Sequence, residues 1–96
     1  MQNLMLFVTY TTKPGMREAF TDEILKSGVL EKIRRESGCL GYEYYQPVGR
    51  ADEILLLEKW ETEEQQAPHL KQPHMEILKS IKNKYVTDTR LDKILF

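Results

Sequence analysis

The first apolar segment of the chain, Leu4–Thr12, has the composition of a β-strand. Both of its alternating faces are apolar, because Leu6 and Val8 lie on one face and Met5 and Phe7 lie on the other. Two apolar faces are typical of a strand that is central in a sheet and covered on both sides. The opening segment therefore predicts a central strand.

The β pattern ends at Lys13-Pro14-Gly15, and the apolar residues of Met16–Glu36 then recur at helical spacing. Gly28 interrupts this stretch, and glycine in a helix interior costs about 1 kcal/mol relative to alanine. We therefore expect a kink or a helix restart near Ser27–Gly28. Ser37-Gly38 closes the segment, with Gly38 in a left-handed conformation.

A β-hairpin is predicted in the middle of the chain. Its strands are Cys39–Gln46 and Glu53–Trp60, and Pro47–Asp52 forms the turn between them. Tyr42 and Tyr44 share one face of the first hairpin strand because their positions differ by two.

The last third of the chain predicts two helices and a strand. Thr62 is a good helix N-cap for the short acidic segment Glu61–Gln66, because glutamates stabilise the positive end of a helix. After a proline-bracketed turn, a second helix is predicted over Pro73–Tyr85, with an apolar stripe of Met75, Ile77, Leu78, Ile81 and Tyr85. A strand follows at Val86–Asp92, and the chain ends on apolar Ile94-Leu95-Phe96.

The order of these elements predicts a single α+β domain over residues 1–96. It is the ferredoxin-like βαββαβ arrangement, a four-stranded antiparallel sheet with helices on one face. The second apolar face of the sheet has no further residues to cover it, and an exposed apolar face is an association site. We therefore expect a homodimer in which two sheets pack face to face.

Composition narrows the class of protein. The 96 residues carry 14 basic and 15 acidic groups, for a net charge of −1, which disfavours nucleic acid as a partner. No apolar run reaches the ~20 residues that span a bilayer, and no leader is evident, so we expect no membrane association and a cytoplasmic protein. The single cysteine, Cys39, excludes an internal disulfide and a thiolate metal cluster.

His69 and His74 are the only side chains whose ordinary pKa lies near neutrality. Either one shuttles protons at the mouth of a pocket, or both are structural residues at helix ends. A metal site is disfavoured because no third histidine or cysteine follows nearby.

Trp60 shares a face of its predicted strand with Glu58, an unusual acidic residue on an apolar strand. Trp60 either packs beneath the helices or forms an aromatic wall for a flat ligand, and the two roles are compatible. Glu58, if buried, needs a partner or a raised pKa and could orient a histidine. Tyr42 and Tyr44 could line the same cavity as Trp60, or could reflect ordinary β propensity.

Basic residues give little indication of an anion site. Lys59 and Lys71 are the only ones close to Trp60 along the chain, which favours an apolar aromatic substrate. Lys32, Arg34 and Arg35 are interspersed with glutamates and are expected on a solvated helix face.

Several of these motifs resemble the antibiotic biosynthesis monooxygenase family of small dimeric α/β barrel proteins. The resemblance covers nearly the whole chain and rests on Lys13-Pro14-Gly15, on Ser37-Gly38-Cys39-Leu40-Gly41-Tyr42, and on Leu57-Glu58-Lys59-Trp60 followed by Glu63-Glu64, His69 and Pro73-His74. It implies a dimeric α/β barrel and a pocket bordered by Trp60, His69 and His74. The haem-degrading branch of the family carries an asparagine where this chain has Phe7-Val8-Thr9, so the sequence departs from that branch.

The resemblance implies a cofactor-independent monooxygenase that oxidises a quinol or another phenol with O2, without flavin, haem or metal. In that reaction His69 or His74 would be the base, and Glu58 would orient a histidine. Trp60 and Tyr44 would form the aromatic wall of the pocket and donate a hydrogen bond to the developing oxyanion. Two alternatives remain. One is an enzyme that isomerises or degrades a small carbonyl signal of the autoinducer-2 type, and the other is a non-catalytic dimeric binding module.

Overall fold

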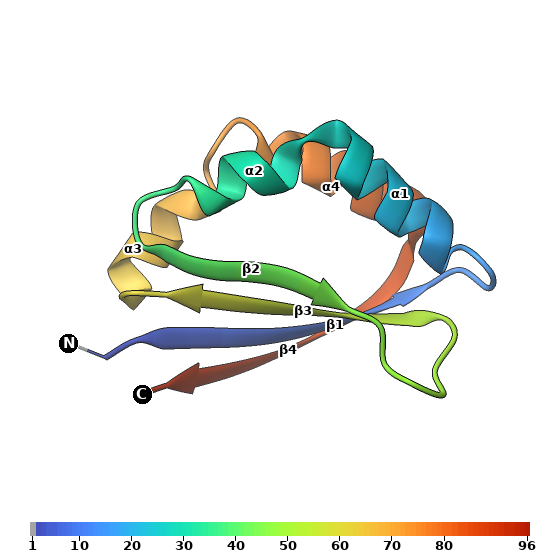
Figure 1. Ribbon diagram of the computed structural model, residues 1–96, viewed down its shortest axis with the longest axis horizontal. Helices are drawn as coiled ribbons and strands as arrows, with labels where there is room; N and C mark the ends of the chain where they lie inside the picture. Colours follow the sequence, from blue (N-terminus) through green and yellow to red (C-terminus); the bar gives the residue numbers. More distant parts are fainter. Residues whose placement is uncertain (1) are drawn as a thin grey trace.

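The predicted opening strand, β1 (Leu4–Thr12), lies inside a four-stranded antiparallel sheet (Figure 1). The computed structural model describes residues 2–96. The strand order is β2-β3-β1-β4, where β3 (Glu53–Trp60) and β4 (Val86–Leu95) flank β1, and β2 (Cys39–Tyr45) forms the other edge. The central place of β1 explains why both of its faces are apolar.

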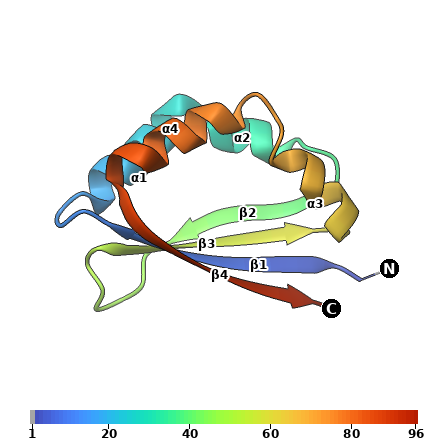
Figure 2. The ribbon, with the colours of Figure 1, turned by 180° about the vertical axis from the view of Figure 1, so that it is seen from behind.

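The helices lie over one face of the sheet (Figures 1 and 2). They are α1 (Arg17–Ser27), α2 (Val29–Arg34), α3 (Glu63–His69) and α4 (Met75–Tyr85), and α3 sits at the end of the sheet where β3 stops. This arrangement confirms the predicted ferredoxin-like α+β fold. No helix within residues 2–96 is long and apolar enough to cross a membrane.

The hydrophobic core fills the space between the sheet and the helices. Val8, Tyr10 and Leu56 point up from the sheet, and Phe20 and Ile24 of α1 pack down on them. The Tyr10 and Phe20 rings meet edge to face, with centroids 6.0 Å apart, which is a favourable aromatic geometry. The core therefore lies on the alternation face that the sequence pattern of β1 and β3 predicts.

The predicted break in the first helical segment is confirmed at Gly28. This glycine ends α1 and precedes α2 with φ of 74°, in the left-handed region. The Ser27 hydroxyl donates to the carbonyl of Ile24 at 2.6 Å and accepts from the backbone N–H of Val29 at 3.2 Å. These bonds satisfy backbone groups that the break leaves without helical partners.

Two elements end three residues later than the sequence predicts. β4 continues past Asp92 to Leu95, because Met5 and Leu4 of β1 pair with Ile94 and Leu95. α3 continues through Pro68 to His69 instead of ending near Gln66, because a proline in the last turn removes only one helical hydrogen bond.

The apolar stripes of the helices also differ in two places. Met16, just before α1, and Ile77 of α4 are each more than a third exposed, although both fit the helical spacing of their segments. Leu78 and Ile81 of the same α4 stripe are buried, as predicted. Spacing alone does not show how far round each helix the sheet reaches.

The opposite face of the sheet has no helix over it (Figure 2). Phe7, Ile94 and Tyr45 on this face are each more than a third exposed, and Leu55 and Leu57 lie half-buried between them. These apolar side chains form a continuous patch because β1 pairs Phe7 with Leu57 and positions Leu55 two residues along.

The left-handed backbone at Gly28 generates a stability prediction. Gly28→Ala should lower the free energy of unfolding by about 1–2 kcal/mol through backbone strain alone, because no atom lies within 4 Å of the added Cβ. Gly41→Ala is the matched control, since its added Cβ would lie 3.9 Å from the Cβ of Lys59 and its φ is not positive. Urea unfolding should show Gly41→Ala unchanged or slightly stabilised; equal losses for both variants would contradict this view of the helix break.

Candidate functional site

One buried carboxylate holds both histidines. Glu36 Oε2 lies 2.9 Å from His69 Nδ1 and 2.7 Å from His74 Nε2, and Glu36 Oε1 lies 3.1 Å from His69 Nδ1. The Glu36 side chain is 9% exposed, His69 is 1% exposed and His74 is 14% exposed. We call these three residues the Glu36–histidine group.

The residues of the Glu36–histidine group lie at the ends of three different helices. Glu36 follows the end of α2, His69 is the last residue of α3, and His74 immediately precedes α4. The start of α3 is fixed by Thr62, whose hydroxyl accepts from the backbone N–H of Gln65 at 3.1 Å.

Gly38 allows α3 to approach the loop that carries Glu36. A Cβ at position 38 would lie 2.6 Å from the side chain of Gln65, and Gly38 has φ of +84°. The backbone N–H of Glu61 donates to the Gly38 carbonyl at 2.8 Å, which ties the start of α3 to the same turn. Only glycine fits both the backbone conformation and this close approach.

The charges of the group determine which histidine nitrogens carry protons. An ionised carboxylate only accepts hydrogen bonds, so each imidazole must offer it an N–H. His69 therefore carries hydrogen on Nδ1 and His74 on Nε2. In the neutral form of each ring, His69 Nε2 and His74 Nδ1 are the lone-pair nitrogens, and His69 Nε2 is buried with no hydrogen-bond partner.

Aromatic rings pack against His69. Its ring centroid lies 4.9 Å from Trp60 and 5.7 Å from Tyr42, at interplanar angles of 44° and 59°. Trp60 and Tyr42 are fully buried on the inner faces of β3 and β2. His69 thus packs on Trp60 and Tyr42 and shares Glu36 with His74. The sequence predicted a pocket bordered by Trp60, His69 and His74, but Trp60 is fully buried and does not line the cavity beside the histidines.

Glu58 does not orient a histidine. Its Oε1 accepts the indole N–H of Trp60 at 3.1 Å, whereas Glu36 provides the carboxylate that binds both histidines. Burial raises the pKa of Glu58, and the Trp60 bond and the nearby His69 only partly oppose this. Glu58 therefore acts on Trp60, fixing the ring against which His69 packs.

A pocket of about 420 Å³ opens beside the histidines. His69, His74 and Glu36 line it together with Lys32 and Arg35. The sequence predicted the basic cluster on a solvated helix face, and Lys32 and Arg35 are indeed exposed. It also singled out Lys59 and Lys71 as the cations closest to Trp60, and this is wrong for the pocket, because Lys32 and Arg35 line it and Lys59 and Lys71 do not.

Tyr44 belongs to a different cavity. It lines a pocket between α1, α2 and β2, whereas Trp60 and Tyr42 are closed off in the interior. The expectation that Tyr42, Tyr44 and Trp60 line one cavity is therefore wrong. The Tyr42 ring lies between Tyr44 and the histidines. Its centroid is 6.0 Å from that of the Tyr44 ring and 5.7 Å from that of the His69 ring.

Glu36 is the residue that the sequence did not identify. It lies 33 positions before His69 and 38 before His74, and no local periodicity reports contacts at that separation. The one available signal is its place beside Ser37-Gly38, where a tight turn fixes the direction of the preceding side chain. Within residues 2–96, no group of three or more histidine, cysteine, aspartate or glutamate side chains has the geometry to hold a metal ion.

The raised pKa of Glu58 predicts a pH-dependent stability. The ordinary pKa of glutamate, about 4.5, applies to the unfolded chain, so the folded protein binds the proton more tightly. Wild-type stability relative to Glu58→Gln should be highest below that ordinary pKa. It should fall as pH rises through the folded pKa, by about 1.4 kcal/mol per unit between the two pKa values.

The amide of Glu58→Gln keeps the acceptor for Trp60, so the comparison isolates the charge. Urea unfolding from pH 4 to pH 8 measures the difference, with exposed Leu40→Ala as a control that adds no titrating group. A wild-type advantage that grows with pH would contradict the burial of Glu58.

Comparisons with known proteins agree with this fold. The sequence model of the family described as Antibiotic biosynthesis monooxygenase matches residues 3–77. No curated protein sequence matches the chain. Among solved structures, PA3566 from Pseudomonas aeruginosa superposes with a TM-score of 0.86 at 22% identity, covering 100% of this chain and 95% of that one.

Two further structures show the same fold. SO0527 from Shewanella oneidensis has a TM-score of 0.85 at 17% identity, over 99% of this chain and 91% of that one. A proposed antibiotic biosynthesis monooxygenase from Chloroflexus aurantiacus has a TM-score of 0.81 at 18% identity, over 98% of this chain and 92% of that one. The match to the family model spans most of the chain and includes the Glu36–histidine group and Trp60. The chain therefore belongs to the antibiotic biosynthesis monooxygenase family.

Proposed function

We propose that the protein is a cofactor-independent monooxygenase that oxidises a quinol or another phenolic compound with O2. The observation that carries this proposal is the Glu36–histidine group on the wall of a 420 Å³ pocket, with His69 packed on Trp60. The volume lies within the range of small-molecule sites.

The first step is removal of a phenolic proton. His74 is the base in this proposal, because it is the more exposed histidine and its Nδ1 carries the lone pair while Nε2–H is held by Glu36. Negative Glu36 stabilises the imidazolium that forms, as a carboxylate behind a general base does. Buried His69 donates to the same carboxylate and holds it in place.

The second step needs only the substrate and O2. The electron-rich phenolate passes one electron to O2, and the resulting radical and superoxide combine into a peroxide at a ring carbon. The peroxide takes up the proton held by the His74 imidazolium. Water then leaves with this proton and the hydrogen of that ring carbon, and a carbonyl remains, so one oxygen atom of O2 enters the product and the other becomes water. Lys32 and Arg35 at the pocket rim would favour the anions modestly, because exposed charges are screened by solvent.

A second candidate function uses the same proton chemistry without O2. The polar lining of the pocket and its two cations suit a small polar or anionic carbonyl compound, which the histidines could isomerise by moving a proton. Dependence on O2 separates this candidate from the first.

Oxygen uptake tests the proposal. A panel of anaerobically prepared quinols should be consumed above the spontaneous rate, equally with and without added flavin. His74→Gln should lower the rate about 10²- to 10⁴-fold, the contribution typical of a general base. Lys71→Ala, an exposed change nearby that leaves the pocket intact, should retain the wild-type rate.

The outcomes separate the alternatives. Uptake at the spontaneous rate for every quinol would refute the monooxygenase for that panel, and proton exchange into a carbonyl substrate without O2 would support the isomerase. If neither occurs in the folded protein, the chain is a binding module.

We also propose that two copies pair through the uncovered face of the sheet. The apolar patch around Phe7 and Leu57 lies beside Asp88, Arg90 and Asp92 of β4, which share that face. An interface between identical copies must be self-complementary, and alternating charges next to an apolar patch meet this condition. Pairing through this face would also cover the outward side chains of β4, which are exposed in the single chain.

Sedimentation tests the pairing. The wild-type protein should sediment at about twice its 11.3 kDa chain mass at micromolar concentration. Phe7→Glu should convert it to a monomer, whereas Leu25→Glu, exposed on the helical side, should leave the dimer intact. A wild-type mass near that of one chain would contradict the proposal.

A further inference from the structure

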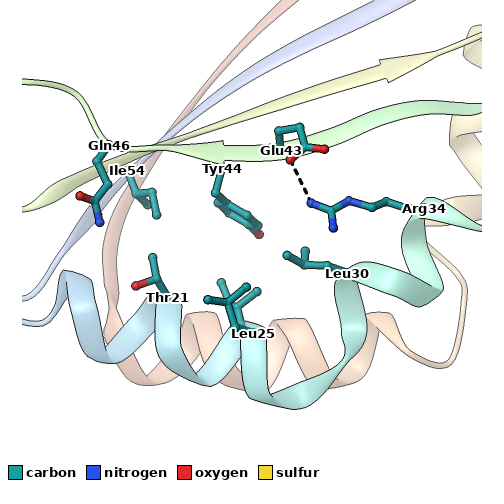
Figure 3. A pocket seen from close by; sticks show the side chains of 9 residues that line it. Thr21, Leu25, Leu30, Arg34, Glu43, Tyr44, Gln46 and Ile54 are labelled. Atoms are coloured by element: carbon teal, nitrogen blue, oxygen red, sulfur yellow. Dashed lines mark hydrogen bonds and ion pairs between the residues drawn. The ribbon is translucent and has the colours of Figure 1, made fainter.

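A second pocket, of about 390 Å³, lies between the helices and the edge strand β2. Leu25 of α1, Leu30 of α2 and Ile54 of β3 form apolar walls around it (Figure 3). We call it the Tyr44 pocket, because the Tyr44 side chain projects from β2 into the space between these walls (Figure 3). It shares no lining residue with the histidine pocket.

The Tyr44 hydroxyl is buried and has no hydrogen-bond partner. Native proteins rarely leave a buried polar group unpaired, so such a group points to a partner that binds from outside. Burial raises the pKa of Tyr44, and the neighbouring Tyr42 hydroxyl, which points its hydrogen toward the Tyr44 oxygen, opposes this only in part. The Tyr44 phenol therefore keeps its proton, and its own O–H remains a donor. The missing partner is therefore a hydrogen-bond acceptor.

The charges at the pocket cancel. Arg34 lies 3.1 Å from Glu43 and also donates to the carbonyl of Tyr42 from Nε and Nη2, at 3.1 Å and 2.9 Å. The pair is drawn at one side of the pocket in Figure 3. The guanidinium is thus already neutralised and held by the protein, so the pocket offers no net charge to attract an anion.

The Thr21 hydroxyl is engaged as well. It donates to the backbone carbonyls of Arg17 and Glu18, at 3.1 Å and 3.0 Å. Of the hydroxyl groups that line the pocket, that of Tyr44 is thus the one whose hydrogen is left to bond a ligand.

We propose that the Tyr44 pocket binds a small, neutral, mainly apolar compound whose carbonyl oxygen accepts the Tyr44 O–H, at a site separate from the histidine pocket. The aliphatic walls bury the carbon skeleton, and the buried Tyr44 donor sets the position of the oxygen. The volume is at the low end for ligand pockets, which limits the compound to one or two fused rings.

A pair of matched probes tests this site. α-Tetralone is a neutral bicyclic ketone, and tetralin has nearly the same shape without the oxygen. NMR titration of backbone amides should show α-tetralone binding with a dissociation constant of about 1 mM or tighter, with shifts centred on α1, α2 and β2. Tetralin should bind about five- to tenfold more weakly, the effect of losing one buried hydrogen bond.

Tyr44→Phe should weaken α-tetralone to the level of tetralin and leave tetralin unchanged. Tyr45→Phe removes a hydroxyl from the exposed face of the same strand and should bind both probes as the wild type does. His74→Gln should also bind α-tetralone normally, so this result does not depend on the oxygen-uptake outcome.

Several results would overturn the proposal. They are an absence of α-tetralone binding up to its solubility limit, equal affinity for the two probes, unchanged binding by Tyr44→Phe, or shifts centred on the histidine pocket.

Discussion

The arrangement around the histidines depends on one buried carboxylate that accepts hydrogen bonds from two imidazoles. Glu36 is almost fully enclosed, and a buried charge is stable only when its hydrogen bonds are satisfied. His69 and His74 satisfy it from α3 and α4, so the same contacts connect the end of α2 to both later helices. The interaction that sets the proton chemistry of the site thus also ties the end of α2 to α3 and α4, in addition to the core packing of Leu78 and Ile81.

The Glu36 carboxylate also determines which nitrogen of His69 faces the buried aromatic residues. Because Glu36 accepts a hydrogen bond from His69 Nδ1, the opposite nitrogen faces the interior near Trp60 and Tyr42. Glu58 holds the Trp60 indole from the other side. Beyond Tyr42, the Tyr44 pocket repeats the pattern of an unpaired polar atom among apolar walls. Family members share a fold while their sites differ, so function has to be argued from such groups.

The fold could be predicted well from the sequence because short-range patterns of apolar and polar residues specify most of its strands and helices. Alternation in Leu4–Thr12 and Glu53–Trp60 identified the strands and their inner faces, and Gly28 marked the helix break. The predicted boundaries were wrong where contacts between residues far apart in the sequence, or the position of a proline in its helix, determine where an element ends. β4 is longer than its own pattern suggests because β1 pairs with its end, and α3 includes Pro68 because that proline stands in the final turn.

The site was predicted in part for the same reason. Trp60, His69 and His74 lie in one short stretch, and their proximity could be inferred. The acidic partner could not, because Glu36 comes from another element and Glu58 was the more conspicuous carboxylate. The cations were misjudged likewise, since Lys32 and Arg35 are near the histidines in space and far from them along the chain.

The central claim, that Glu36 accepts an N–H from both histidines, can be measured directly. Long-range ¹H–¹⁵N NMR of the imidazoles, at a pH where each ring holds one proton, reports which nitrogen carries it. The structure predicts hydrogen on Nδ1 of His69, protected from exchange, and on Nε2 of His74, with both signatures lost in Glu36→Ala. Hydrogen on Nε2 of His69, or spectra that Glu36→Ala leaves unchanged, would contradict the account.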